Sequence, residues 1–327
     1  MLFSAGSLRI CHSIRPESKR TGARKESHRM MNDEKGIVGV DLGGTKIRAA
    51  VTARNGSLMG PAVERPTGNR KSRKTVEAAL MRSIQDAVGQ SGIAMEQVEA
   101  IGIGAPGPLD LSTGTILKAP NLPGLHHYPL RRRVEERFRV PVRVDNDGNC
   151  FTLGEALYGS GRSKGIVLGV TLGTGVGCGV VIGGRVFHGA TGTAGEIWAT
   201  PYGRSTIEEW FSARGVSGLH QRRTGESRGA RQLFQSAESG DREALKTWDR
   251  FGYHLGRALA ALVNLLDPDL IALGGSVSRA HAFFLPAMDK NLRKIINPAP
   301  AQYLQILPAL LKEGAVQGAA ALCRSRA

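Results

Sequence analysis

Short apolar runs alternate along this chain with longer amphipathic segments. The short runs have the length and the β-branched content of buried strands; they cover residues 98–103, 140–144 and 270–273, and hairpins begin near residues 36 and 166. The amphipathic segments repeat apolar residues with helical spacing; they cover residues 75–88, 134–138, 149–158 and 244–266. Strands that alternate with helices predict an α/β fold.

The first strand run, VGVDLGGTKIRAA from Val38, ends in a polar turn rich in glycine. A P-loop places several residues between its first glycine and its Gly-Lys pair, whereas Gly43, Gly44, Thr45 and Lys46 are contiguous. A dinucleotide-binding turn leads into a helix, whereas residues 47–52 are largely small or β-branched and favour a second strand. The turn is therefore predicted to join the two strands of a hairpin.

The same pattern occurs a second time in the chain. The segment LGVTLGTGVGCGVV, from Leu168, aligns without a gap with VGVDLGGTKIRAAV, so that Gly39 meets Gly169 and Gly43 meets Gly173. Each copy continues into a second hairpin turn that contains glycine. Two related hairpins would place two sets of backbone N–H groups on opposite sides of a cleft, which favours a phosphate site over a purely structural turn.

A third glycine turn and an acidic motif add candidate chemistry. The segment PDLIALGGSVS predicts a strand that ends at Gly274-Gly275, where the backbone can approach an anion or a polar ring. The segment VRVDNDGN predicts a strand end with Asp145 and Asp147 on one side and Asn146 on the other. Phosphoryl transfer to an alcohol uses a carboxylate to accept the hydroxyl proton. Asp147 is the candidate base, whereas Asp145 is interpreted as a structural loop or cap residue.

Composition and charge narrow the class of protein. A chain of 327 residues, 41% of them hydrophobic, is long enough for two domains with their own cores. No apolar run is long enough to span a membrane, and the four cysteines are too scattered for a disulfide framework, so a cytoplasmic location is predicted. The net charge of +16 is spread among acidic residues and accompanies no nucleic-acid-binding motif. Neither nucleic acid nor a membrane is therefore an expected partner.

Residues 1–35 lack the periodicity of the rest of the chain and contain no apolar core of a secretory signal. They are predicted to form a disordered N-terminal extension. A transit peptide remains an alternative, which the acidic residues of this segment disfavour. Translation from Met30 or Met31 is an alternative start, and a protein that begins at Met31 is expected to be fully active.

Taken together, these motifs resemble the ROK family (repressor, open reading frame, kinase), which includes sugar kinases. The resemblance extends from residue 36 to the C-terminus. Its motifs, in order, are DLGGTKI at Asp41, GAPGPLD at Gly104, APNLPG at Ala119, DNDGN at Asp145, TLGTGVGCG at Thr171, GTAGE at Gly192 and LGGSVS at Leu273. Seven motifs in the family's order make a chance similarity implausible.

The resemblance implies the actin-like (ribonuclease H-like) duplicated ATPase fold, an α/β fold of two domains with an interdomain cleft. The smaller N-terminal domain would comprise residues 36–155 and the larger C-terminal domain residues 156–312. A C-terminal helix at about 313–327 is expected to pack back on the smaller domain.

The resemblance also implies roles for individual residues, with Asp147 as the catalytic base. The positions that match the family's ATP and phosphate contacts are Asp41, Gly43, Gly44, Thr45, Lys46, Gly173, Thr174, Gly274 and Gly275. The positions that match its sugar contacts are Asn121, Asn146, Glu196 and Glu208. Asp41 would hold Mg²⁺ through a water molecule. ATP and Mg²⁺ are thus the expected cofactors, a hexose and a nucleotide the expected small-molecule partners, and a homodimer the expected assembly.

One departure from the family concerns zinc. Members of the family commonly follow their Gly-Glu pair with a histidine and a cysteine cluster that bind structural zinc, whereas this chain has Ala199 at the histidine position and no cysteine nearby. A zinc-free subgroup is implied, with no zinc site. The loop is then expected to be held by packing of Trp198, Tyr202 and Trp210 and by a capping box that starts at Ser205 or Thr206.

The leading hypothesis is ATP-dependent phosphorylation of a hexose, glucose or a related aldose or amino sugar, at its 6-hydroxyl group. A transcriptional regulator of the same family is an alternative, but it would need a helix-turn-helix domain, for which the region before residue 36 is too short. A glucokinase that uses polyphosphate is a second alternative, which the positive charge keeps open. An actin-like or chaperone-like ATPase is a third, and it has no need of the sugar motifs.

Overall fold

The structure is a computed structural model that describes residues 34–324. The predicted N-terminal extension, apart from its last two residues, lies outside the described residues, as does the end of the predicted C-terminal helix. None of the described helices combines the length and the apolarity that crossing a lipid bilayer requires.

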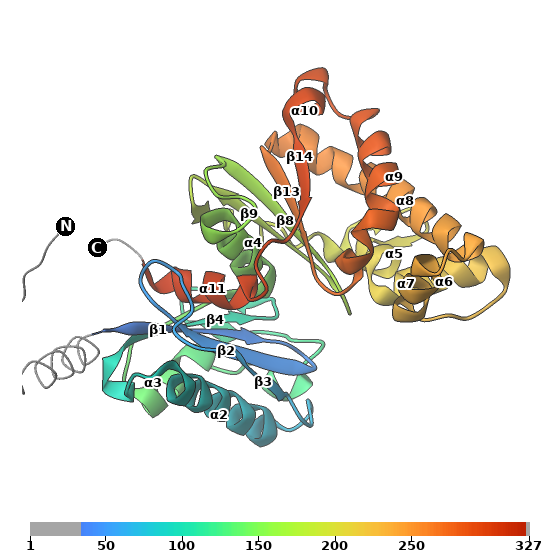
Figure 1. Ribbon diagram of the computed structural model, residues 1–327. Helices are drawn as coiled ribbons and strands as arrows, with labels where there is room; N and C mark the ends of the chain where they lie inside the picture. Colours follow the sequence, from blue (N-terminus) through green and yellow to red (C-terminus); the bar gives the residue numbers. More distant parts are fainter. Residues whose placement is uncertain (1–33, 325–327) are drawn as a thin grey trace, which may run out of the picture. The chain divides into compact units, whose positions relative to one another are not determined.

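The first sheet has the strand order β3-β2-β1-β4-β7 (Figure 1). Its strands are β1 (Gly36–Leu42), β2 (Lys46–Thr52), β3 (Val63–Pro66), β4 (Val98–Ala105) and β7 (Val142–Asn146). Strand β1 pairs antiparallel with β2 and parallel with β4, so the polar turn after β1 is a hairpin turn, as predicted. Because β1, β4 and β7 are parallel, their carboxyl ends lie at one edge of the sheet.

The second sheet repeats this arrangement with the order β10-β9-β8-β13-β14. Its strands are β8 (Ile166–Leu172), β9 (Val176–Ile182), β10 (Arg185–Val186), β13 (Leu270–Gly274) and β14 (Gln305–Pro308). Strand β8 corresponds to β1: it pairs antiparallel with the next strand of its hairpin and parallel with β13. The duplication predicted from the two glycine turns is therefore confirmed strand by strand.

Helices connect the strands and cover both sheets. The α-helices are α2 (Arg73–Ser91), α3 (Leu130–Phe138), α4 (Asp147–Tyr158), α5 (Ile207–Phe211), α6 (Ala213–Thr224), α7 (Ala230–Glu238), α8 (Arg242–Leu266), α9 (His281–Arg293), α10 (Pro298–Tyr303) and α11 (Gly314–Ala321). Short 3-10 helices are η1 (Met95–Gln97), η2 (Pro123–Leu125), η3 (Ile197–Ala199), η4 (Val277–Ala280) and η5 (Leu322–Arg324). Two small two-stranded sheets, β5 (Leu109–Asp110) with β6 (Thr115–Ile116) and β11 (Pro201–Tyr202) with β12 (Ser205–Thr206), complete the fold.

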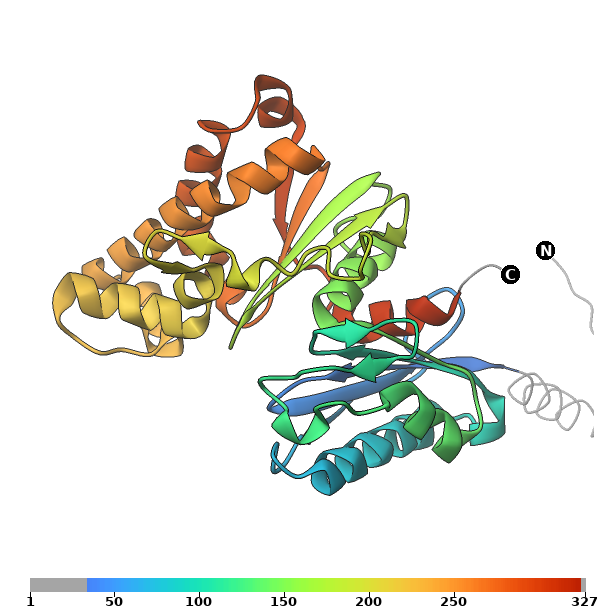
Figure 2. The ribbon, with the colours of Figure 1, turned by 180° about the vertical axis from the view of Figure 1, so that it is seen from behind.

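Each sheet is covered on both faces by helices. Helices α2 and α3 lie on one face of the first sheet and α11 on the other, as the two opposite views show (Figures 1 and 2). On strand β8 of the second sheet, Leu168 and Val170 face the core formed with α8 and α9, whereas Val167 faces the core formed with α4. Burial on both faces explains why the central strands are continuous apolar runs rather than alternating ones.

Glycines on the central strands let two helices approach the sheets closely. A methyl group added to Gly39 of β1 would lie 2.0 Å from the carbonyl oxygen of Val316 in α11. One added to Gly169 of β8 would lie 2.0 Å from Oγ1 of Thr152 in α4. The aligned glycines Gly39 and Gly169 thus each let a helix pack closely on their strand, α11 on β1 and α4 on β8. Helices α4 and α11 also contact each other, with Gly318 at the closest point.

Candidate functional site

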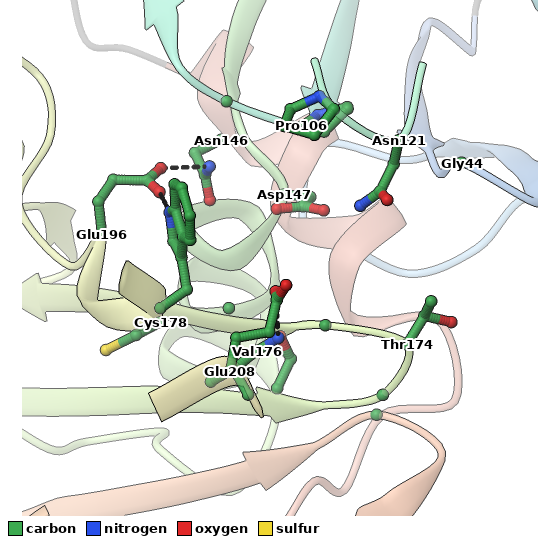
Figure 3. Close-up of a pocket in the computed structure, with 18 of the residues that line it drawn as sticks. Gly44, Pro106, Asn121, Asn146, Asp147, Thr174, Val176, Cys178, Glu196 and Glu208 are labelled. Carbon is green, nitrogen blue, oxygen red and sulfur yellow. Dashed lines mark hydrogen bonds between the residues drawn. The ribbon is translucent and has the colours of Figure 1, made fainter. Parts of the chain in front are cut away.

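A pocket of about 340 Å³ lies where the polar turns at the strand ends meet (Figure 3). Its walls come from segments far apart in the sequence: Gly44, Pro106-Gly107, Pro120-Asn121, Asn146-Asp147, Thr171, Gly173 to Cys178, Gly195-Glu196, Trp198, Glu208 and Gly275. All three glycine turns singled out in the sequence contribute to this pocket, and so does the acidic motif.

The acidic motif forms the junction between β7 and α4. Asn146 is the N-cap of α4, and its side-chain oxygen accepts a hydrogen bond from the backbone N–H of Gly148 at 2.8 Å. Asp147 is the first residue of α4. The side-chain alternation of a strand, which had placed Asp147 on the same side as Asp145, therefore does not apply to it. The prediction of a strand end was wrong for Asp147 because the helix begins two residues earlier than its apolar pattern indicates. A carboxylate at a helix N-terminus is stabilised by the backbone N–H groups there.

Asp145 differs from its interpretation as a loop or cap residue. It belongs to β7, and only 3% of its surface is exposed. One carboxylate oxygen accepts bonds from the backbone N–H of Asn146 at 2.7 Å and from the side chain of Asn149 at 2.9 Å. The other pairs with Nε2 of His188 at 2.7 Å. Asp145 therefore anchors the turn that carries Asp147, while the capping role belongs to Asn146.

Burial and nearby charges shift the pKa values of two carboxyl groups at this site. Burial, followed by the negative charges of Asp41 and Glu196, raises the pKa of Asp147 to about 7, although a hydrogen bond from the Gly148 N–H acts against the shift. Burial also raises the pKa of Asp41 to about 6, against the positive charges of Arg48 and Lys46. Two such carboxyl groups beside a pocket are a common signature of an acid–base site.

All four predicted sugar-contacting residues line the pocket. Glu196 is held at both carboxylate oxygens: Oε1 accepts a bond from Nδ2 of Asn146 at 2.8 Å, and Oε2 accepts one from the indole N–H of Trp198 (Figure 3). Glu208 lies in α5 and accepts the backbone N–H of Val176 at 3.3 Å. Asn121 faces Asp147 from the turn that approaches Gly44. Carboxylates and amides with further lone pairs and donors suit sugar hydroxyl groups.

The predicted phosphate-contacting residues divide into two groups. Those that line the pocket are Gly44, Gly173, Thr174 and Gly275. Those that do not line it are Asp41, Gly43, Thr45, Lys46 and Gly274. Lys46 departs most from expectation, because its ammonium group donates to Glu64 on β3 at 2.7 Å. Gly274 packs against the ring of Phe151 instead of facing the pocket.

Each of the two aligned turns is closed by a backbone hydrogen bond of its own. The N–H of Gly43 donates to the carbonyl of Lys46 at 3.0 Å, and the N–H of Gly173 donates to the carbonyl of Gly175 at 2.9 Å. These two N–H groups hold their own turns in the structure, and phosphate binding by Gly43 and Gly173 stays a prediction. Gly275 has φ of +86°, and a methyl group there would lie 2.3 Å from the Leu172 carbonyl oxygen, which explains the need for glycine.

The loop expected to replace the family's zinc site is held partly as predicted. Tyr202 packs edge-on against Trp210 at 5.6 Å between ring centroids, and both rings contact His254 of α8. Thr206 and Glu209 form a capping box at the start of α5. Trp198 does not join this packing, and it lines the pocket instead, so the prediction was wrong for this residue.

Two pocket features escaped the sequence analysis, the indole of Trp198 and the buried thiol of Cys178. The pairing of His188 with Asp145, outside this pocket, escaped it as well. Neither Cys178 nor His188 shows a spacing with other polar residues that would mark it. Trp198 carried a usable signal, since it lies two residues after Glu196, the last residue of the predicted sugar-binding motif GTAGE.

The described residues offer few ligands for a metal ion. Within residues 34–324, no three or more His, Cys, Asp or Glu side chains are grouped so that they could hold a metal ion. Mg²⁺ makes smaller demands on the protein, because it is commonly bound by one or two carboxylates together with substrate phosphates. Asp41, whose negative charge acts on Asp147, fits such a cation.

The chain was compared with known proteins. A model of the ROK family matches residues 37–326. A glucokinase from Thermotoga maritima is 30% identical over 315 residues, which cover 89% of this chain and 98% of the relative. An N-acetyl-D-glucosamine kinase from Pectobacterium atrosepticum is 32% identical, with 87% and 97% covered.

The solved structures include a ROK family glucokinase from Streptomyces griseus in complex with glucose and AMPPNP. It is 29% identical to this chain, has a TM-score of 0.77, and the match covers 88% of this chain and 98% of that one. The match to the family model spans the duplicated sheets and the pocket alike. This chain therefore belongs to the ROK family and has the duplicated, actin-like fold of that family's sugar kinases.

Proposed function

We propose that this sugar kinase transfers the terminal phosphoryl group of ATP to the 6-hydroxyl group of a hexose, which is glucose or a related aldose or amino sugar. The observation that carries the proposal is the placement of Asp147, a carboxyl group with a pKa of about 7, in one pocket with four sugar-competent side chains and three glycine turns. The names of the two curated relatives support the substrate class. The AMPPNP in the solved relative supports ATP as donor.

The proposed reaction assigns the base to Asp147. Its ionised carboxylate accepts the proton of the sugar hydroxyl as the oxygen attacks the phosphorus, and the bond to the leaving ADP oxygen breaks. Asn121, Asn146, Glu196 and Glu208 orient the sugar through its other hydroxyl groups. Phosphoryl transfer depends mostly on positioning and charge neutralisation. The fixed side chain of Glu196 would contribute by holding the sugar in position.

The phosphate side of the pocket is assigned to the turns at Gly44 and at Gly173-Thr174, with Gly275 on the side of the adenosine. Glycine at these points lets a phosphate approach the backbone closely. Mg²⁺, when bound with ATP near Asp41, would neutralise the charge of the phosphates. To contact a phosphate, Lys46 would first have to break its ion pair with Glu64.

An assay of ADP release tests the proposal. Release should require a sugar and should be highest for glucose or an amino sugar when a panel of hexoses is compared at equal concentration. ADP release without sugar would favour an actin-like ATPase. Sugar phosphate formed from polyphosphate in the absence of ATP would favour the polyphosphate-using alternative, and sugar binding without any transfer would favour a regulator.

The pH dependence should report the shifted pKa of Asp147. The base must be ionised, so we expect kcat/KM for the sugar to fall about tenfold per pH unit below pH 7, in line with a pKa of about 7 in the free enzyme. In a Glu196→Gln variant the neighbouring negative charge is gone, and the acid limb should move to lower pH. Rates measured at pH 4 to 9 in one buffer series check this. A wild-type acid limb near the ordinary aspartate value of 3.8 would contradict the assignment.

The absence of zinc is also part of the proposal. Between residues 195 and 215 the chain has no cysteine and no histidine, and packing of Tyr202, Trp210 and His254 supports the loop. Purified protein should contain no stoichiometric zinc, and it should keep its melting temperature and activity after zinc-selective chelation with Mg²⁺ resupplied. Elemental analysis that finds one zinc per chain, or unfolding on chelation, would overturn this point.

The remaining expectations belong to the same proposal. These are a cytoplasmic location, a homodimer, and the division into domains at residues 36–155 and 156–312. Analytical ultracentrifugation would test the homodimer. X-ray scattering in solution with and without sugar would test the domains, because two domains that close over a substrate should reduce the radius of gyration.

A further inference from the structure

Trp198 stands apart from the other two tryptophans of the chain. It belongs to the short helix η3, lines the pocket, and has 38% of its surface exposed. Trp248 is 1% exposed within the core, and Trp210 packs against Tyr202 and His254. An indole ring costs free energy when it is left in water. A half-exposed indole in a pocket therefore suggests that a ligand covers it.

The ring of Trp198 is held in one orientation by the site itself. Its indole N–H donates to Oε2 of Glu196, while Oε1 of the same carboxylate accepts the amide of Asn146 (Figure 3). Asn146 is in turn fixed as the N-cap of α4, next to Asp147. The aromatic ring and the candidate base are thus connected through two hydrogen bonds and one peptide bond.

Among residues 34–324, no other aromatic side chain lines this pocket. Apart from Trp198, the lining side chains are acids, amides, hydroxyls, prolines, one valine and one cysteine, and many positions are glycine. A hexose has a rim of hydroxyl groups and two faces that carry C–H bonds. Acids and amides can bind the rim, and an aromatic ring, with its partially negative face, packs well against C–H groups.

We propose that Trp198 is a specificity-determining residue that packs against a C–H face of the sugar and selects hexoses whose hydroxyl groups are equatorial on that face. An axial hydroxyl pointing at the ring would lose its water without gaining a hydrogen-bond partner. Hexoses of the glucose configuration therefore bind better than epimers with an axial hydroxyl, such as galactose or mannose. This inference rests on the proposed sugar kinase activity and names the substrate class of that same pocket.

The first test is sugar binding by tryptophan fluorescence, which needs no phosphoryl transfer. The chain has three tryptophans, of which only Trp198 lies in the pocket, so the change in emission on adding glucose should disappear in Trp198→Phe. The matched control Trp210→Phe removes an indole from the same loop outside the pocket and should keep the response. A response that persists in Trp198→Phe and is lost in Trp210→Phe would overturn the inference.

The second test separates a role in specificity from a role in folding. In Trp198→Ala, the KM for glucose should rise about tenfold or more, and the preference for glucose over galactose and mannose should fall by a similar factor, while the KM for ATP stays unchanged. Trp198→Phe keeps an aromatic face, so it should retain most of the preference even if the alanine variant folds poorly. An unchanged preference in Trp198→Ala, or equal losses for every sugar and for ATP, would overturn the inference.

Failure of the wild-type protein to phosphorylate any sugar would instead refute the proposed function, and the fluorescence result would be unaffected.

Discussion

Replacing Asp147 by asparagine should reduce kcat for sugar phosphorylation by about 10² to 10⁴, the usual range for loss of a general base. Asparagine keeps the size and most of the hydrogen bonding of the side chain but cannot accept the hydroxyl proton. Binding of glucose and of ATP should remain close to that of the wild type, because the other pocket residues are unchanged. Steady-state kinetics together with calorimetric binding of each substrate measures both effects.

The same variant carries its own folding control. Because the pKa of Asp147 is raised to about 7 in the folded protein, above its ordinary value of 3.8, the folded state favours the protonated form. The resulting loss of stability grows as the pH rises from the ordinary pKa of 3.8 to about 7, is complete above pH 7, and disappears below the ordinary pKa. At pH 8, Asp147→Asn should unfold at a temperature no lower than the wild type. Asp249→Asn, on the exposed side of α8, controls for the substitution itself. Near-normal turnover in Asp147→Asn would remove Asp147 from its proposed role.

Replacing Gly318 by alanine should destabilise the protein by several kcal/mol. Alanine normally stabilises a helix relative to glycine by about 1 kcal/mol, but here the added methyl group would lie 1.7 Å from the carbonyl oxygen of Cys150 in α4. The backbones of α4 and α11 would have to move apart, and overpacking of this kind against backbone costs about 1–3 kcal/mol or more. Urea denaturation monitored by circular dichroism gives the free energy of unfolding.

Gly89→Ala is the matched control for this prediction. Gly89 also lies within a helix, α2, but a methyl group there would meet no atom within 4 Å. It should stabilise the protein by about 0.5–1 kcal/mol through helix propensity alone. If Gly318→Ala proved as stable as Gly89→Ala, the close packing of α4 on α11 would not contribute as described.

The parts of the fold that the sequence predicted correctly depend on local patterns. The hairpin after β1 follows from contiguous turn residues and small or β-branched neighbours, and the second sheet follows from the gap-free alignment of Gly39 with Gly169. The close approach of a helix to each of these glycines explains why both copies carry one. Patterns of this kind need no knowledge of what lies across the fold.

The contacts that the sequence did not anticipate concern side chains whose surroundings are set by distant segments. Lys46 was expected beside a phosphate, but β3 brings Glu64 within 2.7 Å of its ammonium group. Trp198 was expected in the packing of its loop, but Glu196 provides a polar partner that turns the indole toward the pocket. His188 could not be matched to Asp145 because 43 residues separate them. Only the tertiary structure decides which of several possible partners each side chain meets.

The packing of α11 against β1 and β4 has a consequence for protein synthesis. These strands leave the ribosome early, but the helix that covers one face of their sheet comes from residues 314–321, near the end of the chain. The second sheet is complete once β14 has been made, and α4, which covers one of its faces, precedes it in the chain. Nascent domains usually fold in order from the N-terminus. In this chain the sheet that is translated first is the one whose covering helix is translated last, so one of its apolar faces stays uncovered until synthesis has reached residues 314–321.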